Sequence, residues 1–316
     1  MVPRPPTVPM RQASDARPPL ELLTLGRLGF QGEGAEAAGE LLRQPKRAAV
    51  LLFVLLSRGG GFTTREEIMS LFWPEADNAR ARNSLRQTLS FLRDALGEHV
   101  ILNRGSSAVG VAPGSLACDA LAFEALLGEG RREEALGLYR GELLPDFHVA
   151  GGDAFGAWLS RRRRHLQGRA AKAAWDVSVG HETLGQAAAA AFWGKRALSL
   201  SPFSESEVQR LLRLLDRLGD WAGALRAYNG LRTHLAREFG TTPAADTTRI
   251  MEELRRRMAS GDFPASIRFG TRRTSPERRR DDRRRRDATW AGPERRSGSD
   301  RREHERRSGC DRRELA

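Results

Sequence analysis

DNARARNSLRQTLSFLRDAL, residues 77–96, carries the clearest helical pattern in the chain. Either Asp77 or Asn78 can cap the start of a helix, because each side chain can accept a hydrogen bond from a free backbone N–H group. Apolar residues then recur at the spacing of one helix face, at Ala81, Leu85, Leu89, Leu92 and Leu96. The pattern predicts an amphipathic helix with one buried face.

The opposite face of this predicted helix carries only side chains that form hydrogen bonds, and none is acidic: Arg82, Asn83, Arg86, Gln87, Ser90 and Arg93. Arginine recognises guanine through two hydrogen bonds, asparagine and glutamine recognise adenine, and serine reaches bases or phosphates. A face that only meets solvent usually mixes glutamate with its basic residues. The face indicates a DNA-recognition helix, and an ordinary amphipathic helix with a basic exterior is the alternative.

The charge of the chain agrees with a nucleic-acid partner, but it is unevenly distributed. The 316 residues have room for about two domains, and they carry a formal net charge of +13 with a pI of about 11.1. Residues 264–316 hold 18 Arg against 10 acidic residues, so this tail supplies +8 of the +13. An argument for DNA binding must therefore rest on where the other charges lie.

Several classes of protein are disfavoured by what the sequence lacks. Cys118 and Cys310 are far apart, which fits neither a disulfide framework nor a zinc site and is typical of a reducing compartment. The longest apolar run, 48–56, is too short to cross a bilayer, and the proline-rich start does not resemble a signal peptide. No catalytic or phosphate-loop motif occurs. We expect a soluble cytoplasmic protein that is not an enzyme, with no cofactor, no metal and no membrane contact.

Two further helices are predicted ahead of the recognition helix. Pro45 opens a segment, AAVLLFVLLSR, that is apolar on nearly all sides and should lie at the centre of a small core. Thr63 and Glu66 have the spacing of a capping box for a second helix that runs through Phe72. A helix, a turn and a second, basic helix form a helix-turn-helix motif.

Strand patterns flank these helices. Residues 20–30 alternate enough to form one or two short strands, and the glycine-rich stretch 32–41 predicts a turn. HVILNR and AVGVA predict a hairpin with Arg104 near its tip, which would make the helix-turn-helix a winged one. We expect contacts to the DNA backbone from the wing and the neighbouring helices, at Lys46, Arg47, Thr63, Thr64, Arg80 and Arg104.

The segments QPKRAAVLLFVLLSRGGGFTTREEIMSLFWPE, ARNSLRQTLSFLRDALG and VILNRGSSAVGV resemble the OmpR-type winged helix of the Streptomyces antibiotic regulatory protein (SARP/AfsR-like) family. Cys118-Asp119, YRGELLP from Tyr139 to Pro145 and a helix centred on Trp158 resemble the bacterial transcriptional activation domain that follows it in that family. The resemblance covers roughly Leu20 to Met258. It implies a recognition helix in the major groove, a wing on the adjacent minor groove or backbone, and RNA polymerase as a partner.

The second half of the chain contains an internal repeat. LGQAAAAAFWGKRALSLSP aligns with LGDWAGALRAYNGLRTHL when Gly185 is placed over Gly219, a separation of 34 residues. This is the period of tetratricopeptide repeats, which are pairs of stacked helices. A weaker copy begins near Gly130.

Two sets of residues in this half have alternative interpretations. Aromatic residues could form the core between helices or line a ligand groove: Trp158, Trp175, Trp193, Trp221 and Tyr228. The run Arg161 to Arg164 could be a solvated helix face whose stems pack over neighbours, or a phosphate-binding patch.

The predicted fold is mainly α: an OmpR-like winged helix-turn-helix (α+β), then an α-helical tetratricopeptide-like domain, with disordered termini. We assign 1–19 to a disordered arm, 20–112 to DNA binding, 113–260 to activation, and 261–316 to an Arg-rich tail with an 11-residue repeat. The predicted function is a sequence-specific activator, independent of a phosphorelay, that binds double-stranded promoter DNA, recruits RNA polymerase and pairs as a homodimer; in a bacterium it would be nucleoid-associated when bound. The alternatives are a helical-repeat scaffold for a partner protein and an RNA-associated factor that acts through the tail.

Overall fold

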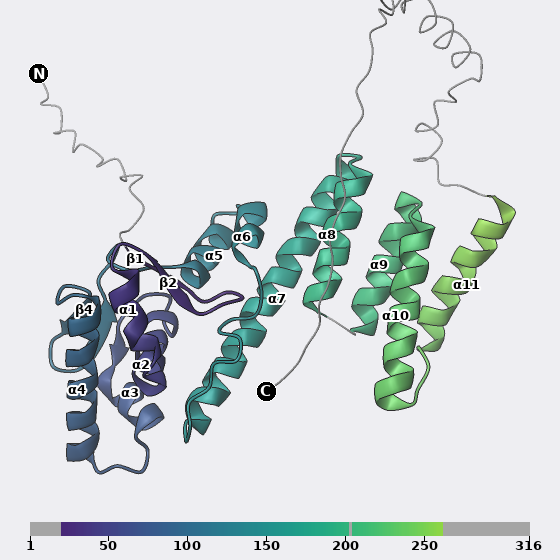
Figure 1. The fold of residues 1–316 in the computed structure, drawn as a ribbon. Helices are drawn as coiled ribbons and strands as arrows, with labels where there is room; N and C mark the ends of the chain where they lie inside the picture. The colour runs from purple at the N-terminus through teal and green to yellow at the C-terminus, as the bar shows by residue number, and fades with distance from the viewer. Residues whose placement is uncertain (1–19, 202–203, 262–316) are drawn as a thin grey trace, which may run out of the picture. The chain divides into compact units, whose positions relative to one another are not determined.

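A computed structural model describes residues 20–201 and 204–261, which are mainly helical with two small sheets (Figure 1). The arm predicted for 1–19 and the tail predicted for 262–316 lie outside the described residues. The mainly α architecture, with a winged helix ahead of stacked helices, agrees with the predicted fold class.

The first sheet has three strands in the order β2-β1-β6. Strands β1 (Leu20–Leu23) and β2 (Gly29–Gly32) are antiparallel, as the alternating pattern predicted. The third strand, β6 (Ala117–Cys118), comes from beyond residue 112 and runs parallel to β1, with Cys118 opposite Leu22. The N-terminal sheet is therefore completed by a segment that the sequence assigned to the second domain.

The glycine-rich stretch predicted to be a turn instead forms helix α1 (Ala35–Leu42), so that prediction was wrong. Gly34, with a φ of 80°, turns the chain into the helix. The helix itself consists mainly of Ala, Glu and Leu, which are good helix formers. Ala38 and Leu41 are fully buried, and this burial outweighs the cost of the single glycine within the helix.

Helices α2 (Pro45–Leu56), α3 (Arg65–Phe72) and α4 (Asn78–Leu96) form the helix-turn-helix. Every residue of α2 from Ala48 to Leu56 is buried, so this helix lies in the core as predicted. The predicted capping box is displaced by one residue. The Thr64 hydroxyl accepts a hydrogen bond from the Glu67 backbone N–H at 3.2 Å, and the Thr64 N–H donates to the Glu67 carboxylate at 3.0 Å.

The predicted hairpin is present as β4 (Ile101–Arg104) and β5 (Ala108–Val111). They pair antiparallel, from Ile101 opposite Val111 to Arg104 opposite Ala108. A two-residue strand, β3 (Thr63–Thr64), pairs with the other edge of β5, which gives the order β3-β5-β4. The wing is thus attached through β3 to the residues that begin α3.

Within the described residues up to 261, seven helices follow the wing. They are α5 (Asp119–Gly128), α6 (Arg132–Leu138), α7 (Asp153–Thr183), α8 (Ala187–Leu200), α9 (Glu205–Leu218), α10 (Trp221–Phe239) and α11 (Ala245–Ser260). Gly185 and Gly219, with φ of 70° and 72°, occupy the same left-handed turn ahead of α8 and α10. This equivalence confirms the predicted repeat. No helix of residues 20–201 or 204–261 combines the length and hydropathy that a bilayer-spanning helix needs.

The aromatic residues of the second half of the chain belong to the core between helices, which was one of their two interpretations. Trp175, Trp221 and Tyr228 are buried, and Trp158 and Trp193 pack partly buried against the same core. The indole ring of Trp175 is covered by the Arg210 guanidinium, 4.2 Å from the ring centroid.

Contacts between the winged helix and the following helices are extensive. The buried Asp119 carboxylate, at the start of α5, accepts hydrogen bonds from the Thr24 N–H at 2.8 Å, the Thr24 hydroxyl at 2.6 Å and the Leu25 N–H at 3.0 Å. The Phe53 ring of α2 meets the Trp158 ring of α7 edge-on, with centroids 5.1 Å apart. The segment after residue 112 therefore contributes to the core of the winged helix.

Candidate nucleic-acid interface

Helix α4 has the two faces that its sequence predicts. The Asp77 carboxylate caps it by accepting a hydrogen bond from the Arg80 N–H at 2.8 Å. The predicted apolar stripe is buried: Ala81, Leu85, Leu89, Leu92 and Leu96. On the other side, five of the six predicted recognition residues are exposed: Arg82, Asn83, Arg86, Gln87 and Ser90. The burial of the stripe fixes which way these side chains face.

Arg93, the sixth predicted recognition residue, is only partly exposed and is engaged with the wing. Its Nε donates to the Ile101 carbonyl at 3.3 Å, and its Nη2 donates to the Asn103 side-chain oxygen at 3.3 Å. Arg93 therefore fastens the C-terminal half of α4 to β4.

A groove of about 580 Å³ runs between α4, the start of α3 and the turn of the wing. It brings together three predicted contact residues, Thr64, Arg82 and Arg86, although they come from two elements. Ser106 and Ser107, at the tip of the wing, form its other wall. Hydroxyl and guanidinium groups on the walls of one groove are well suited to phosphate oxygens.

Arg65 is a basic residue of this groove that the sequence analysis missed. Its backbone N–H donates to the Ser107 carbonyl at 2.8 Å, and its Nη2 donates to the Asn103 side-chain oxygen at 2.9 Å. Burial, with the positive charges of Arg93 and Arg86, lowers the pKa of the Arg65 guanidinium below its usual value. The sequence analysis missed Arg65 because it placed the capping box one residue too early. With Thr64 as the cap, Arg65 is the first residue of the helix and lies beside the wing.

A second groove, of about 300 Å³, lies on the other side of α4, against the start of α2. It brings the predicted backbone contacts Lys46 and Arg47 next to the predicted base contact Gln87. The Lys46 ammonium lies 5.1 Å from the ring centroid of Trp73, and the Arg47 guanidinium lies 4.1 Å from that of Phe91. These aromatic contacts orient both cations.

The remaining predicted backbone contacts differ in their accessibility. Arg80 is exposed and pairs with Asp77 at 3.2 Å, and Arg104 is exposed with its guanidinium 5.7 Å from the ring centroid of Phe62. Thr63 is buried, and its hydroxyl is hydrogen-bonded to the Ser57 hydroxyl at 2.8 Å. The prediction that Thr63 reaches the DNA backbone was therefore wrong, because its side chain faces the core.

The arginine run of α7 differs from both of its interpretations. Arg162 forms an ion pair with Glu124 of α5, and both side chains are 16% exposed. Arg163 donates to the carbonyl oxygens of Leu143, at 2.8 Å, and Leu144. Only Arg161 and Arg164 are exposed, so the middle of the run is structural.

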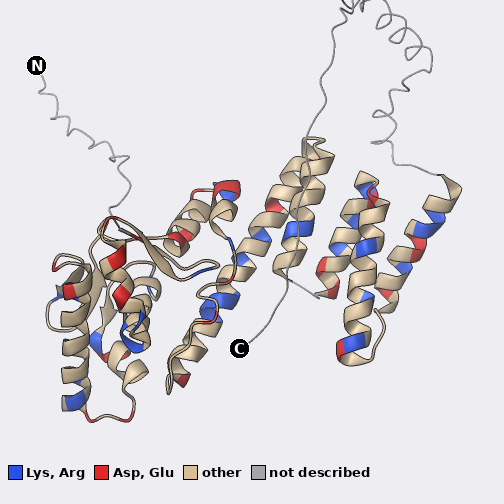
Figure 2. Cartoon of the chain, in the orientation of Figure 1, with Lys and Arg blue, Asp and Glu red and all other residues tan. Residues whose placement is uncertain are grey.

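Acidic residues lie beside α4 as well as basic ones, and Figure 2 marks Lys and Arg in blue and Asp and Glu in red. Glu66 of α3 lines the groove with Arg82 and Arg86. Between Asn78 and Arg93 the helix contains no Asp or Glu. No group of His, Cys, Asp and Glu suited to a metal ion occurs within residues 20–201 and 204–261. The exposed guanidinium groups on this face of α4 suit the phosphates of an extended polyanion.

Comparison with known proteins assigns the second half of the chain. Residues 128–255 match the family model of the bacterial transcriptional activator domain. Comparison with curated proteins gives no significant match. Among solved structures, the chain is similar to Mycobacterium tuberculosis EmbR in complex with a low affinity phosphopeptide, with 22% identity and a TM-score of 0.49 over 76% of this chain. The alignment spans 65% of the EmbR chain, which is less than two thirds.

The order of elements completes the assignment. A winged helix whose α4 carries a basic exposed face precedes the matched activator domain, and the motifs of both parts resemble one family of regulators. Residues 128–255 are thus similar to the bacterial transcriptional activator domain, and a winged helix lies ahead of them in the chain.

Proposed function

We propose that this chain is a transcriptional regulator of the Streptomyces antibiotic regulatory protein type, which binds promoter DNA through α4 and activates transcription by recruiting RNA polymerase. The observation that carries the proposal is the exposed face of α4, whose five hydrogen-bonding side chains include no acid. Arg86 and Gln87 lie at the centre of that face and border the two grooves on either side. In the major groove, these two side chains would read guanine and adenine.

The grooves beside α4 support a matching set of backbone contacts. Arg65, Thr64 and the wing tip would hold one phosphate strand, and Lys46 and Arg47 the other. Such contacts set the register of a protein on the duplex without reading its sequence. Arg104, near the wing tip, would reach the adjacent backbone or minor groove.

We assign DNA binding to residues 20–112 and activation to residues 113–260. The match of 128–255 to an activator domain supports the second assignment. A single winged helix offers a small interface, so a second copy on a neighbouring half-site would raise the effective concentration of each contact. We therefore propose a homodimer on the promoter.

The experiment uses the full chain, because Asp119 and β6 hold the first sheet together and a fragment ending at residue 112 would lose them. Genome-wide mapping of bound sites gives the operator. Titrations on this operator and on a scrambled duplex then measure specificity, and transcription with purified polymerase measures activation. The double variant Arg86→Ala, Gln87→Ala should lose both sequence preference and activation, whereas Arg161→Ala, an exposed arginine on α7, should retain both.

The scaffold alternative predicts a different result. A winged helix that only contacts a protein partner would tolerate an acidic side chain on the face of α4. The variant Asn83→Glu should therefore abolish operator binding under our proposal, since its carboxylate would repel phosphate. Retention of operator binding and activation by Asn83→Glu would contradict it. The RNA alternative depends on the tail, which lies outside the described residues.

A further inference from the structure

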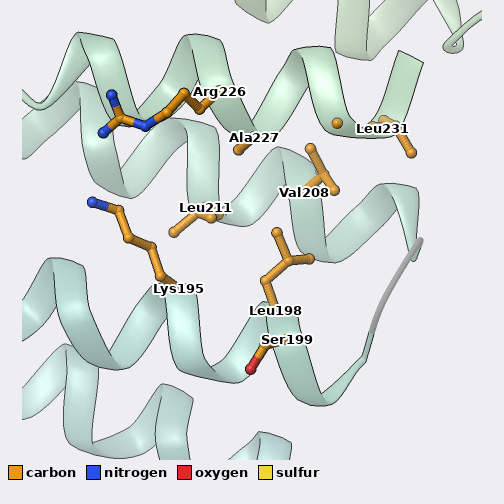
Figure 3. A pocket seen from close by; sticks show the side chains of 10 residues that line it. Lys195, Leu198, Ser199, Val208, Leu211, Arg226, Ala227 and Leu231 are labelled. Atoms are coloured by element: carbon orange, nitrogen blue, oxygen red, sulfur yellow. The ribbon is translucent and has the colours of Figure 1, made fainter. Parts of the chain in front are cut away.

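A pocket of about 350 Å³ lies among α8, α9 and α10, within the activator domain and away from α4 (Figure 3). Helices α8 and α10 each pack against α9, which forms the floor between them. The lining is predominantly apolar and is contributed by Leu198, Val208, Leu211, Ala227 and Leu231. A volume near the low end of the range for small-molecule sites suits a compact ligand.

One end of the pocket is cationic. In Figure 3, the ammonium group of Lys195 and the guanidinium group of Arg226 lie at the same end, away from Leu231 and Val208. The Lys195 Nζ pairs with the Asp220 carboxylate at 2.6 Å, and that carboxylate also caps α10 by accepting from the Gly223 N–H at 2.8 Å. Arg226 forms no ion pair with any residue in the part of the chain that the structure describes. The end therefore holds two cations and one anion, an excess of one positive charge.

We infer that this pocket binds a small amphiphilic anion, with its carboxylate or phosphate head on Arg226 and Lys195 and its short apolar tail on α9. The apolar walls explain the tail, since burial of each methylene group there removes apolar surface from water. The unpaired guanidinium explains the head, because arginine binds carboxylate and phosphate oxygens bidentately. Arg226 is exposed, so water hydrates its guanidinium when the pocket is empty, and Arg226 and Lys195 would repel a cationic ligand at this end.

The position of the pocket gives the ligand a regulatory effect. It bridges α8 and α10, the two equivalent helices of successive repeats, across α9. A ligand that binds only the folded arrangement stabilises that arrangement by mass action. Occupancy would therefore stiffen the repeats of the activator domain without contact to the α4 interface.

The first test is calorimetric titration of the full chain with octanoate, below the concentration at which it forms micelles. Octyl phosphate distinguishes a phosphate head from a carboxylate head, and 1-octanol and acetate test the tail and the head alone. We expect saturable binding of octanoate or octyl phosphate, with binding of octanol and of acetate at least tenfold weaker. Octanol that binds as tightly as octanoate would overturn the assignment of the head group.

Variants locate the site. Arg226→Gln should weaken binding at least tenfold, whereas Arg232→Gln, an exposed arginine on the same helix that does not line the pocket, should leave it unchanged. Gly230 lines the pocket, and a Cβ atom built there meets no heavy atom within 4 Å. Gly230→Phe should therefore fill the space and abolish binding, and Gly230→Ala is its matched control for helix propensity.

Thermal unfolding of each variant shows that it is folded, and the same titrations decide the outcome. Octanoate and octyl phosphate that give no saturable binding to the full chain would overturn the inference. So would binding that is unchanged in both Arg226→Gln and Gly230→Phe. Neither result affects the proposed DNA binding, because the pocket shares no residue with the grooves beside α4.

Discussion

Arginines of α4 and α7 look similar in the sequence, but they have opposite surroundings in the structure. On α4, Arg82 and Arg86 are exposed and border a groove, and no carboxylate of the described residues pairs with them. On α7, Arg162 is paired with Glu124, and Arg163 donates to backbone carbonyls. The middle of the contiguous arginine run on α7 thus connects this helix to α5 and to the segment before α7. Arg82 and Arg86 of α4 have no such contact among the described residues and remain available to a partner.

The difference comes from what lies opposite each helix. The partner of Arg162 is a carboxylate on α5, which also lies 3.6 Å from the Arg169 guanidinium. Arg65 and Arg93 both donate to the neutral side-chain amide of Asn103, and Arg93 also donates to the Ile101 carbonyl, so these partners position the two cations without neutralising them. The charge of an arginine is available for DNA only when its neighbours leave it uncompensated.

The largest expected effect comes from breaking the ion pair between Arg162 of α7 and Glu124 of α5. Arg162→Ala should lower the free energy of unfolding by about 3 kcal/mol, because it leaves the Glu124 carboxylate partly buried without its closest partner. Urea titration measures the loss, and Arg161→Ala on the exposed side of the same run should stay within about 0.5 kcal/mol of the parent. Equal stability of the two variants would mean that the pair does not join α5 and α7.

The corresponding change on α4 should affect binding and not folding. Arg86→Ala should weaken operator binding by about 1–3 kcal/mol and relax the base preference at one position. Its free energy of unfolding should stay within about 0.5 kcal/mol of the parent, because the side chain is exposed. Titrations on operator and scrambled duplex are the measurement. An unchanged ratio of the two affinities would remove Arg86 from the base contacts.

Asn103 tests how the uncompensated arginines are positioned. Asn103→Ala removes the acceptor that Arg65 and Arg93 share, which should weaken operator binding by about 1 kcal/mol. A double-mutant cycle with Arg65→Ala separates positioning from simple loss of a contact. If Asn103 acts through Arg65, the two losses should not add. Strict additivity would show that Asn103 does not position that guanidinium.

The smallest expected effect concerns Cys118 of β6, where the chain passes from the winged helix to the helices that follow it. Burial, aided by the Asp119 carboxylate, raises the pKa of the Cys118 thiol from 9.0 to about 11. The folded state therefore holds this proton more tightly, and the resulting stabilisation is complete well below pH 9, begins to fall as pH approaches 9 and is lost as pH rises through 11. Between pH 7 and 9 the loss is about 0.4 kcal/mol.

Urea titrations at both pH values measure this effect, with Cys118→Ala as the reference that cancels all other titrating groups. The parent should lose more stability than the variant between pH 7 and 9. An identical loss in both proteins would show that the thiol keeps an ordinary pKa in the folded state.

The sequence alone predicted the elements whose information is local. The apolar stripe of α4 has the period of a helix, the wing strands alternate around a turn, and Gly185 and Gly219 mark one repeat. Each of these patterns has a physical cause within a few residues of itself. The exposed face of α4 followed directly, because burial of one face of a helix determines the direction of the other.

The tertiary structure decided what depends on partners distant in sequence. Burial of Ala38 and Leu41 made a helix of α1, and the pairing of β6 with β1 joined segments almost a hundred residues apart. Glu124 and the Leu143 carbonyl gave the α7 arginines their structural role. Asn103 and the wing turn brought Arg65 into the interface, and the meeting of α8, α9 and α10 created the pocket. In each case the energy of a side chain depends on which groups surround it, and no periodicity in the chain specifies those groups.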